Sequence, residues 1–325
     1  MARPKAGYLV LRYSIQAAMV ALVAWIGLRH QILGMAQGAA SLDSFCPFGA
    51  IESLPSLLAG NGFIRKIGTS NFVLIGSVGL LTLGFSGSFC GWLCPFGAVQ
   101  DLLAWVGRLL FRGRTHLVPA RLHTWLRHLR WAVLALILWM SAKYLTLWFA
   151  DYDPFRALFH FKFESAIAIA LVAATVLGGV LVERFFCLYA CPLGALVGGL
   201  GKTGYITVHR SEEACIDCAL CARACPSRIA VDQGLVVCDQ HCTMCAECVD
   251  VCPAPGALRI ASGASGESFS PVVLGTATVA LFFALIGTGW AMGWWSTGAG
   301  CGSCTSEPPS PTVASTARVD AGIEW

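Results

Sequence analysis

The sequence predicts an α-helical integral membrane protein with about five transmembrane helices and a small α+β domain inserted before the last of them. Three observations indicate this fold. Of the 325 residues, 56% are hydrophobic and only 12% are charged, about half the charged share of a soluble domain. Several stretches approach the roughly 20 apolar residues that cross a hydrocarbon core. Sixteen cysteines stand in short-spaced clusters, which indicates metal ligation rather than a disulfide framework.

Apolar stretches and basic loops define the expected topology. Arg12 near the start of the chain and an arginine-rich segment over 108–130 place these parts in the cytoplasm, so the tail is external. The net charge of +4 is small and does not gather on one face, which excludes a nucleic-acid partner. The predicted helices cover about 8–33, 70–89, 131–150, 165–186 and 270–292. The expected domains are 1–69 with an external loop, 70–202 in the membrane, the insert 203–262, the last helix in 263–300, and a disordered tail 301–325.

The strongest pattern is a cysteine run that occurs twice in the insert. Its spacing, Cys-x2-Cys-x2-Cys-x3-Cys-Pro, is that of bacterial ferredoxins, in which three close thiolates bind one [4Fe-4S] cluster and the fourth cysteine binds the other. We therefore expect a two-cluster ferredoxin domain of the bacterial type. Cluster one is assigned to Cys215, Cys218, Cys221 and Cys252, and cluster two to Cys242, Cys245, Cys248 and Cys225.

Other residues of the insert support this interpretation. Two short strands are expected at 206–208 and 258–260, around the cysteine runs. Cys238 is expected to be a spare thiol near cluster two, although it could replace Cys242 as a ligand. A pair of zinc knuckles is the alternative, but zinc needs neither the third cysteine nor the proline that follows the fourth.

A second pattern, Cys-x3-Cys-Pro, occurs in the membrane part at Cys90 and Cys94 and again at Cys187 and Cys191. A cysteine before proline suits a helix N-terminus, where the helix dipole favours a thiolate and an anionic cluster. Together these four cysteines could hold one further [4Fe-4S] cluster at the cytoplasmic membrane boundary. The alternatives are one cluster per unit, completed by other ligands, and buried cysteines without a metal.

Three cysteines and two histidines are harder to assign. Cys46 is the second cysteine of a partial third copy of the unit, in which Leu42 stands where the first cysteine would be. The topology places Cys46 outside the membrane with Cys301 and Cys304, where the tail pair is expected to form a disulfide or, with Cys46, an outer metal site. His30 and His160 each look isolated, so neither is assigned to a haem or quinone.

The two units and the duplicated run together resemble membrane polyferredoxins. This class includes nitrous oxide reductase regulator-like proteins, the quinol-oxidising membrane ferredoxin of periplasmic nitrate reductase systems and accessory ferredoxins of cytochrome oxidase assembly. The resemblance covers about 70–262. It implies a carrier in the bacterial cytoplasmic (inner) membrane that exchanges electrons between the quinone pool or a cytoplasmic donor and a respiratory redox partner. A large external flavin-binding domain, present in the nitrous oxide proteins, is missing from this sequence.

The expected function is single-electron transfer through [4Fe-4S] clusters, as a subunit of an oxidoreductase system and with no catalytic residue in this chain. The expected partners are the lipid bilayer, a redox protein or another membrane subunit, and a quinone. Two alternatives remain open. The chain could be an accessory factor that reduces or delivers copper through Cys46, Cys301 and Cys304, or a regulatory membrane protein whose clusters sense redox state.

Overall fold

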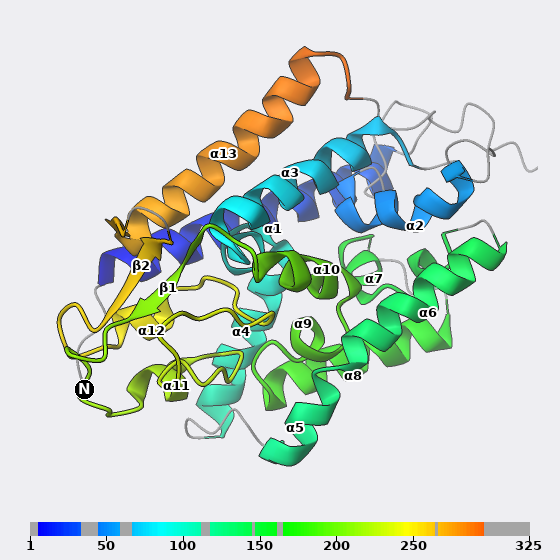
Figure 1. Ribbon diagram of the computed structural model, residues 1–325. Helices are drawn as coiled ribbons and strands as arrows, with labels where there is room; N and C mark the ends of the chain where they lie inside the picture. Colours follow the sequence, from blue (N-terminus) through cyan, green and yellow to red (C-terminus); the bar gives the residue numbers. More distant parts are fainter. Residues whose placement is uncertain are drawn as a thin grey trace, which may run out of the picture.

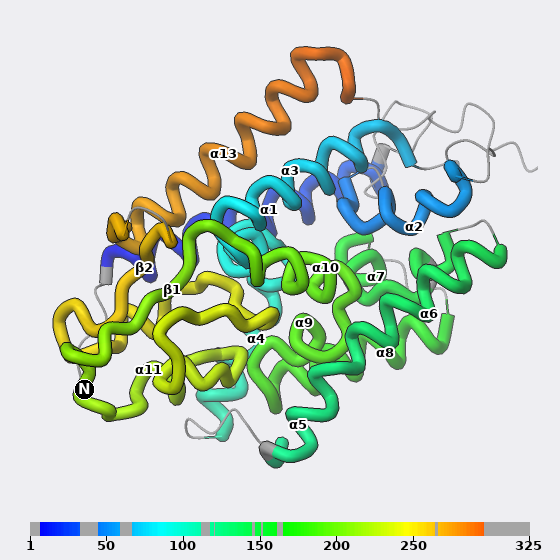
Figure 2. Tube along the Cα trace, viewed as in Figure 1, coloured from blue at the N-terminus to red at the C-terminus, as the bar shows by residue number. Residues whose placement is uncertain are grey.

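The computed structural model describes residues 6–33, 45–58, 67–111, 118–144, 147–160, 165–263 and 266–295. Most of these residues are helical, and the short strands lie together in the insert at one end of the molecule (Figure 1). Figure 2 follows the chain from the helices into the insert and back out into the last helix. The expectation of a mostly helical chain with an inserted α+β domain is confirmed.

In the part of the chain that the structure describes, two helices are long and apolar enough to cross a membrane. They are α1 (Ala6–Leu33) and α13 (Pro271–Ala291). The other three predicted stretches contain α3 (Thr69–Phe85), α6 (Leu129–Tyr144) and α8 (Ala166–Leu181), which have 16 or 17 residues each. At 1.5 Å per residue, such a helix spans only about 25 Å of a core about 30 Å thick. The expectation of five membrane-spanning helices is therefore not confirmed.

The remaining helices complete the body of the molecule and the insert. In the body, α13 packs on α3, α4 packs on α8, and α10 lies between α3 and α6. The bounds are α2 (Pro47–Leu58), α4 (Pro95–Leu110), α5 (Ala120–Leu126), α7 (Pro154–His160), α9 (Phe185–Tyr189), α10 (Pro192–Gly201), the π-helix η3 (Phe89–Leu93) and the 3₁₀ turn η4 (Phe149–Asp151), with α11 (Leu220–Ala224) and α12 (Glu247–Asp250) in the insert.

The insert is built on a small antiparallel sheet, whose third strand lies beyond the predicted end of the insert at 262. Strand β1 (Ile206–Arg210) pairs with β2 (Leu258–Ser262), and β2 pairs with β3 (Ser268–Phe269). Both predicted strands are confirmed, with Val208 opposite Ile260 in the register. These two side chains are buried in one core with Tyr8 of α1 and Trp92 of η3. The insert is therefore packed directly against the helical body.

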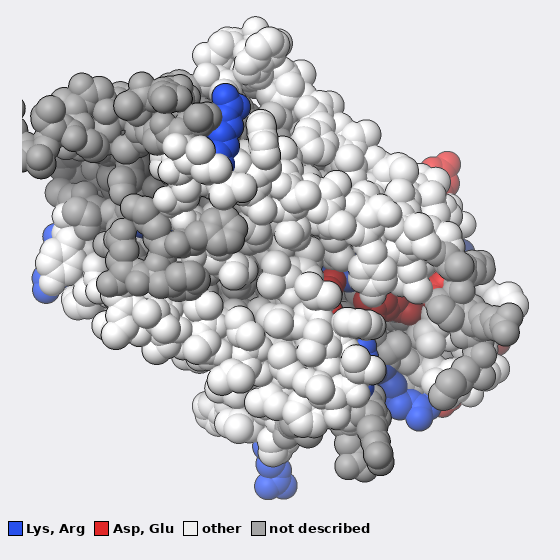
Figure 3. Space-filling view, turned by 180° about the vertical axis from the view of Figure 1, so that it is seen from behind, with Lys and Arg blue, Asp and Glu red and all other residues white. Residues whose placement is uncertain are grey.

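The helices expose a broad apolar surface. Figure 3 shows a face on which charged side chains are few. Large hydrophobic side chains are exposed on several helices, among them Trp25 of α1, Trp139 of α6, Leu177 of α8 and Trp290 of α13. A soluble monomer rarely exposes so much apolar surface, whereas hydrocarbon accepts it at no cost.

The arginine-rich segment binds the insert. The sequence favours a surface helix on lipid headgroups for 108–130, but Arg127 pairs with Asp239 at 2.7 Å and Arg130 donates to the carbonyl oxygen of Gln240 at 3.1 Å. These two arginines therefore contact the insert, which the sequence did not predict.

Candidate metal centres

Two small cavities in the insert are lined by cysteines. Each has a volume of about 20 Å³. Cys215, Cys218, Cys221 and Cys252 line one cavity, and Cys225, Cys242, Cys245 and Cys248 line the other. These are the two groups that the crosswise assignment puts together, with the fourth cysteine of each run beside the other run. Four thiols around one space fit a [4Fe-4S] cluster, and iron binding by them stays a prediction.

The backbone takes the same unusual path in both runs. Asp217 and Ala219 flank the middle cysteine of the first run, with φ angles of 50° and 52°, and Met244 and Ala246 flank that of the second, with φ angles of 48° and 63°. Residues with a side chain rarely adopt this left-handed region, and they persist there only when the surroundings hold them. Both loops are therefore bent tightly around their cavities.

Burial raises the pKa of the four cluster-two thiols, which makes them poor acids in the absence of a cation. It raises the pKa of the Cys242 thiol to about 12 and that of Cys248 well above its ordinary value. Because the thiolate is the form that binds metal, iron has to supply the positive charge, and its binding should release protons.

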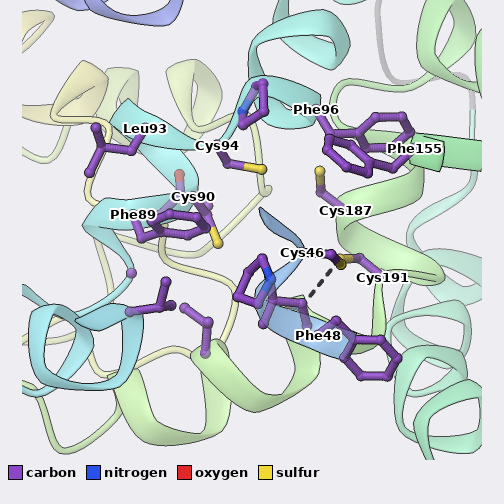
Figure 4. Close-up of a pocket in the computed structure, with 18 of the residues that line it drawn as sticks. Cys46, Phe48, Phe89, Cys90, Leu93, Cys94, Phe96, Phe155, Cys187 and Cys191 are labelled. Atoms are coloured by element: carbon purple, nitrogen blue, oxygen red, sulfur yellow. Dashed lines mark hydrogen bonds between the residues drawn. The ribbon is translucent and has the colours of Figure 1, made fainter. Parts of the chain in front are cut away.

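A third and much larger cavity, which we call the boundary cavity, lies between the insert and the helical body. Its volume is about 380 Å³. Figure 4 shows five cysteine side chains reaching toward it from separate elements. They are Cys46, Cys90, Cys94, Cys187 and Cys191, which we call the boundary cysteines. The two Cys-x3-Cys-Pro units, nearly 100 residues apart in the sequence, therefore meet at one site.

The prediction that each Cys-Pro pair begins a helix is confirmed. Cys94 is the N-cap of α4, and its Sγ accepts a hydrogen bond from the Gly97 N–H at 3.4 Å. Cys191 is the N-cap of α10, and its Sγ accepts from the Gly194 N–H at 3.2 Å. Helix α2 likewise begins at Pro47. Three helix N-termini, each the positive end of a dipole, thus meet at the boundary cavity.

The structure corrects the expected position of Cys46. This residue does not stand apart from the two complete units; it lines the boundary cavity with them. Helix α2 packs on α3 and α6, and Asn71 of α3 donates to the Cys46 carbonyl oxygen at 2.9 Å, which holds the start of α2 at the cavity. Cys301 and Cys304 lie outside the described residues.

The structure also places Cys238 and the two histidines. Cys238 is exposed and lines none of these three cavities, whereas Cys242 lines two of them. The interpretation of His30 and His160 as isolated is wrong, because their rings meet edge to face with centroids 5.7 Å apart.

A buried ion network, absent from the sequence expectations, joins the helices to the insert. Asp101 of α4 accepts from Arg12 at 2.7 Å and from Arg184 at 2.6 Å, and Arg12 also pairs with Glu247 of α12. Burial by itself raises the pKa of Asp101, but Arg184 and Arg12 lower it to about 2. Gln16 adds a further hydrogen bond to Asp101. An arginine inside an apolar stretch, such as Arg12, is the sequence signal that points to such a site.

The π-helix η3 lies directly against the second cysteine run of the insert. Trp92 is fully buried and donates through Nε1 to the Met244 carbonyl oxygen at 3.0 Å. Cys242 lines both the cluster-two cavity and the boundary cavity. The two cavities therefore share a wall.

Gly91→Ala is expected to force this wall apart. A Cβ atom at Gly91 would lie 2.1 Å from the Thr243 carbonyl oxygen, a distance that no real contact tolerates. We expect slower electron exchange between the ferredoxin clusters and any cluster in the boundary cavity, measured by freeze-quench EPR after partial reduction. Gly84→Ala is the control, because nothing lies within 4 Å of its Cβ position. Equal exchange rates in the two variants would contradict the shared wall.

The described residues include no group of three His, Cys, Asp or Glu side chains close enough to hold a single metal ion. The cysteine groups instead surround cavities, as the ligands of a cluster do. Fold and cavities define the class of protein: a ferredoxin-type iron-sulfur protein whose ferredoxin domain is packed on an apolar helical body.

Comparison with known proteins agrees with this class. A family model described as a 4Fe-4S binding domain matches residues 69–115 and 165–209, and each matched segment contains one Cys-x3-Cys-Pro unit. The chain is 28% identical over 274 residues to the Escherichia coli protein named "Putative electron transport protein YccM", covering 78% of this chain and 74% of that protein. No solved structure matches the chain.

Two further relatives are covered less completely. The ferredoxin-type protein NapH of Escherichia coli is 31% identical over 50% of this chain and 58% of its own length. Protein NirI of Paracoccus denitrificans is 35% identical over 55% of this chain and 27% of its own length. The chain is thus related to ferredoxin-type electron-transport proteins, and the resemblance seen in the sequence is confirmed. This relationship supports an iron-sulfur electron-transfer role of the same general kind.

Proposed function

We propose that this chain is a membrane-bound electron-transfer protein that holds two [4Fe-4S] clusters in its ferredoxin domain and a third at the boundary cavity. Bound clusters supply reversible one-electron chemistry. The chain's own residues bind the iron through cysteine, exclude water and fix the distance between the sites. It would connect the quinone pool or a cytoplasmic donor with a respiratory redox partner.

The main support for this proposal is that the cluster-two cavity and the boundary cavity share a wall at Cys242. This thiol lines the cluster-two cavity and also the boundary cavity. Clusters in both places would be separated by little more than one side chain and η3. Trp92 of η3 donates to the Met244 carbonyl oxygen, and Tyr8 of α1 donates to that of Cys245, so both helices are held against this loop of the insert. The exposed cluster-one side of the insert remains accessible to a soluble donor, because Cys215 and Cys218 are not fully buried.

The membrane attachment rests on separate support. Helices α1 and α13 are long and apolar enough to span the bilayer, and both pack against the insert or its neighbours through Tyr8 and Leu274. Basic residues at the start of the chain and in 108–130 favour a cytoplasmic position for the ferredoxin domain.

Iron and sulfide analysis of the anaerobically purified full chain, with EPR after reduction by dithionite, tests the proposal. Three clusters predict about 12 iron atoms per chain, and the ferredoxin pair alone predicts about 8. A colourless protein without iron would overturn electron transfer through clusters, and a content of about 8 would overturn the third cluster.

A further inference from the structure

We propose that Arg130 raises the reduction potential of a [4Fe-4S] cluster held by the boundary cysteines, because its buried charge offsets the negative charge of that cluster. This inference rests on the proposed function, since it requires a cluster at the boundary cavity. It adds a residue that is not a ligand and that sets how easily the site accepts an electron.

The position of Arg130 is unusual for a guanidinium. The residue is 2% exposed and lines the boundary cavity. Its Nη2 donates to the Gln240 carbonyl oxygen at 3.1 Å, and within the described part of the chain its Nε is a buried atom with no hydrogen-bond partner. Asp239 of the insert lies near enough to attract this guanidinium, but its carboxylate is paired with Arg127. A buried charge that is only partly balanced is costly, so this placement is explained if an anion occupies the cavity.

The chain makes room for this arrangement. A Cβ atom at Gly198 of α10 would lie 2.9 Å from Arg130 Nη2 and 2.0 Å from the Gln240 carbonyl oxygen. Glycine at this position lets the guanidinium and the insert approach α10, which begins at the boundary cysteine Cys191.

Other groups around the cavity favour an anion as well. The hydroxyl of Thr243 lines the cavity and, among the described residues, is a second buried donor without a partner. The N-termini of α2, α4 and α10 all meet at the cavity, and each carries a positive partial charge. A cluster with four thiolate ligands is anionic and accepts hydrogen bonds at sulfur, so it matches these surroundings in charge and in hydrogen bonding.

Arg184 does not play the same part. It also lines the cavity, but one edge of its guanidinium, Nε and Nη2, makes a bidentate contact with the Asp101 carboxylate at 2.6 and 2.7 Å. Its charge is therefore directly paired within the buried ion network, although it also lies near three of the boundary cysteines, Cys90, Cys94 and Cys187. No carboxylate of the described residues forms a direct ion pair with Arg130.

The electrostatic effect has a definite sign. Reduction adds one electron to the cluster, with no bond formed or broken, and so adds one negative charge beside Arg130. Burial opposes this change, because a low dielectric disfavours the more charged state. The same low dielectric strengthens the attraction of a nearby cation for the added electron. Removing the cation should therefore lower the potential.

The test is a potentiometric EPR titration of Arg130→Gln in the full-length protein, with dithionite as the reductant. We expect the boundary cluster to become at least tenfold harder to reduce, which is 59 mV for a one-electron couple. The two ferredoxin clusters should titrate as in the unaltered protein. Arg130→Lys keeps the charge and should restore most of the potential.

Arg127→Gln is the matched control. Arg127 holds the neighbouring Asp239 of the insert at 2.7 Å but does not line the boundary cavity. This variant should weaken the same contact between α5, α6 and the insert without moving the boundary potential. The inference is overturned if Arg127→Gln shifts the potential as much as Arg130→Gln, or if Arg130→Lys titrates like Arg130→Gln.

The failure of this inference can be told apart from that of the proposed function. If the unaltered protein contains about 8 iron atoms and shows no third EPR signal, the boundary cluster itself is disproved. If it contains about 12 and Arg130→Gln titrates unchanged, only the role of Arg130 is disproved.

Discussion

Cys94→Ser is expected to lower the iron content from about 12 to about 8 atoms per chain and to abolish one EPR signal. Cys94 stands at the N-terminus of α4, where its Sγ accepts a hydrogen bond from Gly97 and lines the boundary cavity. A serine hydroxyl keeps the helix cap but does not ionise at neutral pH, so it is a poor ligand for iron. The loss should therefore affect the cluster and leave the helices intact, as circular dichroism would show.

Cys238→Ser is the control for this experiment. Cys238 is exposed and lines none of the three cavities, so its replacement should leave iron and spectra unchanged. If Cys94→Ser keeps full iron content, the boundary cysteines do not ligate a cluster through Cys94. A loss of iron in Cys238→Ser would instead show that Cys238 is a ligand, although it lines none of the three cavities.

Asp101→Asn is expected to destabilise the fold by about 3–5 kcal/mol, the usual cost of breaking a buried ion pair from one side. Asparagine keeps the shape of the side chain but removes the charge that Arg12 and Arg184 share. Both arginines are almost fully buried, so they would face each other without a carboxylate between them. Chemical denaturation of the detergent-solubilised protein measures the loss.

The pH dependence gives this prediction a second readout. The pKa of Asp101 is about 2 in the folded chain and 3.8 in its ordinary state. Its contribution to stability is therefore complete above pH 3.8 and is lost as the pH falls toward 2. The Asn variant should lack this part of the acid response.

Asp217→Asn serves as the comparison for Asp101→Asn. Asp217 also pairs with an arginine, Arg210, at 2.7 Å, but its side chain is 79% exposed. Because solvent screens an exposed pair, its loss should change stability far less. Equal effects of the two substitutions would show that the Asp101 network does not hold the insert to the helices.

Local patterns in the sequence predicted the parts of the site that depend on near neighbours. The ferredoxin spacing predicted which cysteines would share a cavity, because three ligands of each group lie within seven residues. Proline after Cys94 and Cys191 predicted two helix starts, because its fixed φ and missing N–H suit the first helical position. The short segments 206–208 and 258–260, on either side of the cysteine runs, were predicted as strands and form β1 and β2.

Hydropathy was less informative about helix length. The predicted stretch 70–89 contains α3, which ends at Phe85; Ser86 then has a φ of 52°, and the π-helix η3 follows. Nothing in its apolar composition marks this break, because the residues on both sides are hydrophobic or small. The break turns Cys90 and Trp92 toward the insert, so a feature that shortens the helix also builds the site.

The sequence by itself determined the cysteine groups, their likeness to ferredoxins and the helices that begin at Cys-Pro, since these depend on spacing within a few residues. Three features appear only in the tertiary structure: Cys46 joins the boundary cysteines, Arg12, Asp101 and Arg184 form one buried network, and Arg130 lines the cavity with its Nε unpartnered among the described residues. The physical reason is that these contacts join residues dozens to hundreds of positions apart, and the packing of the helices against the insert selects which of them meet.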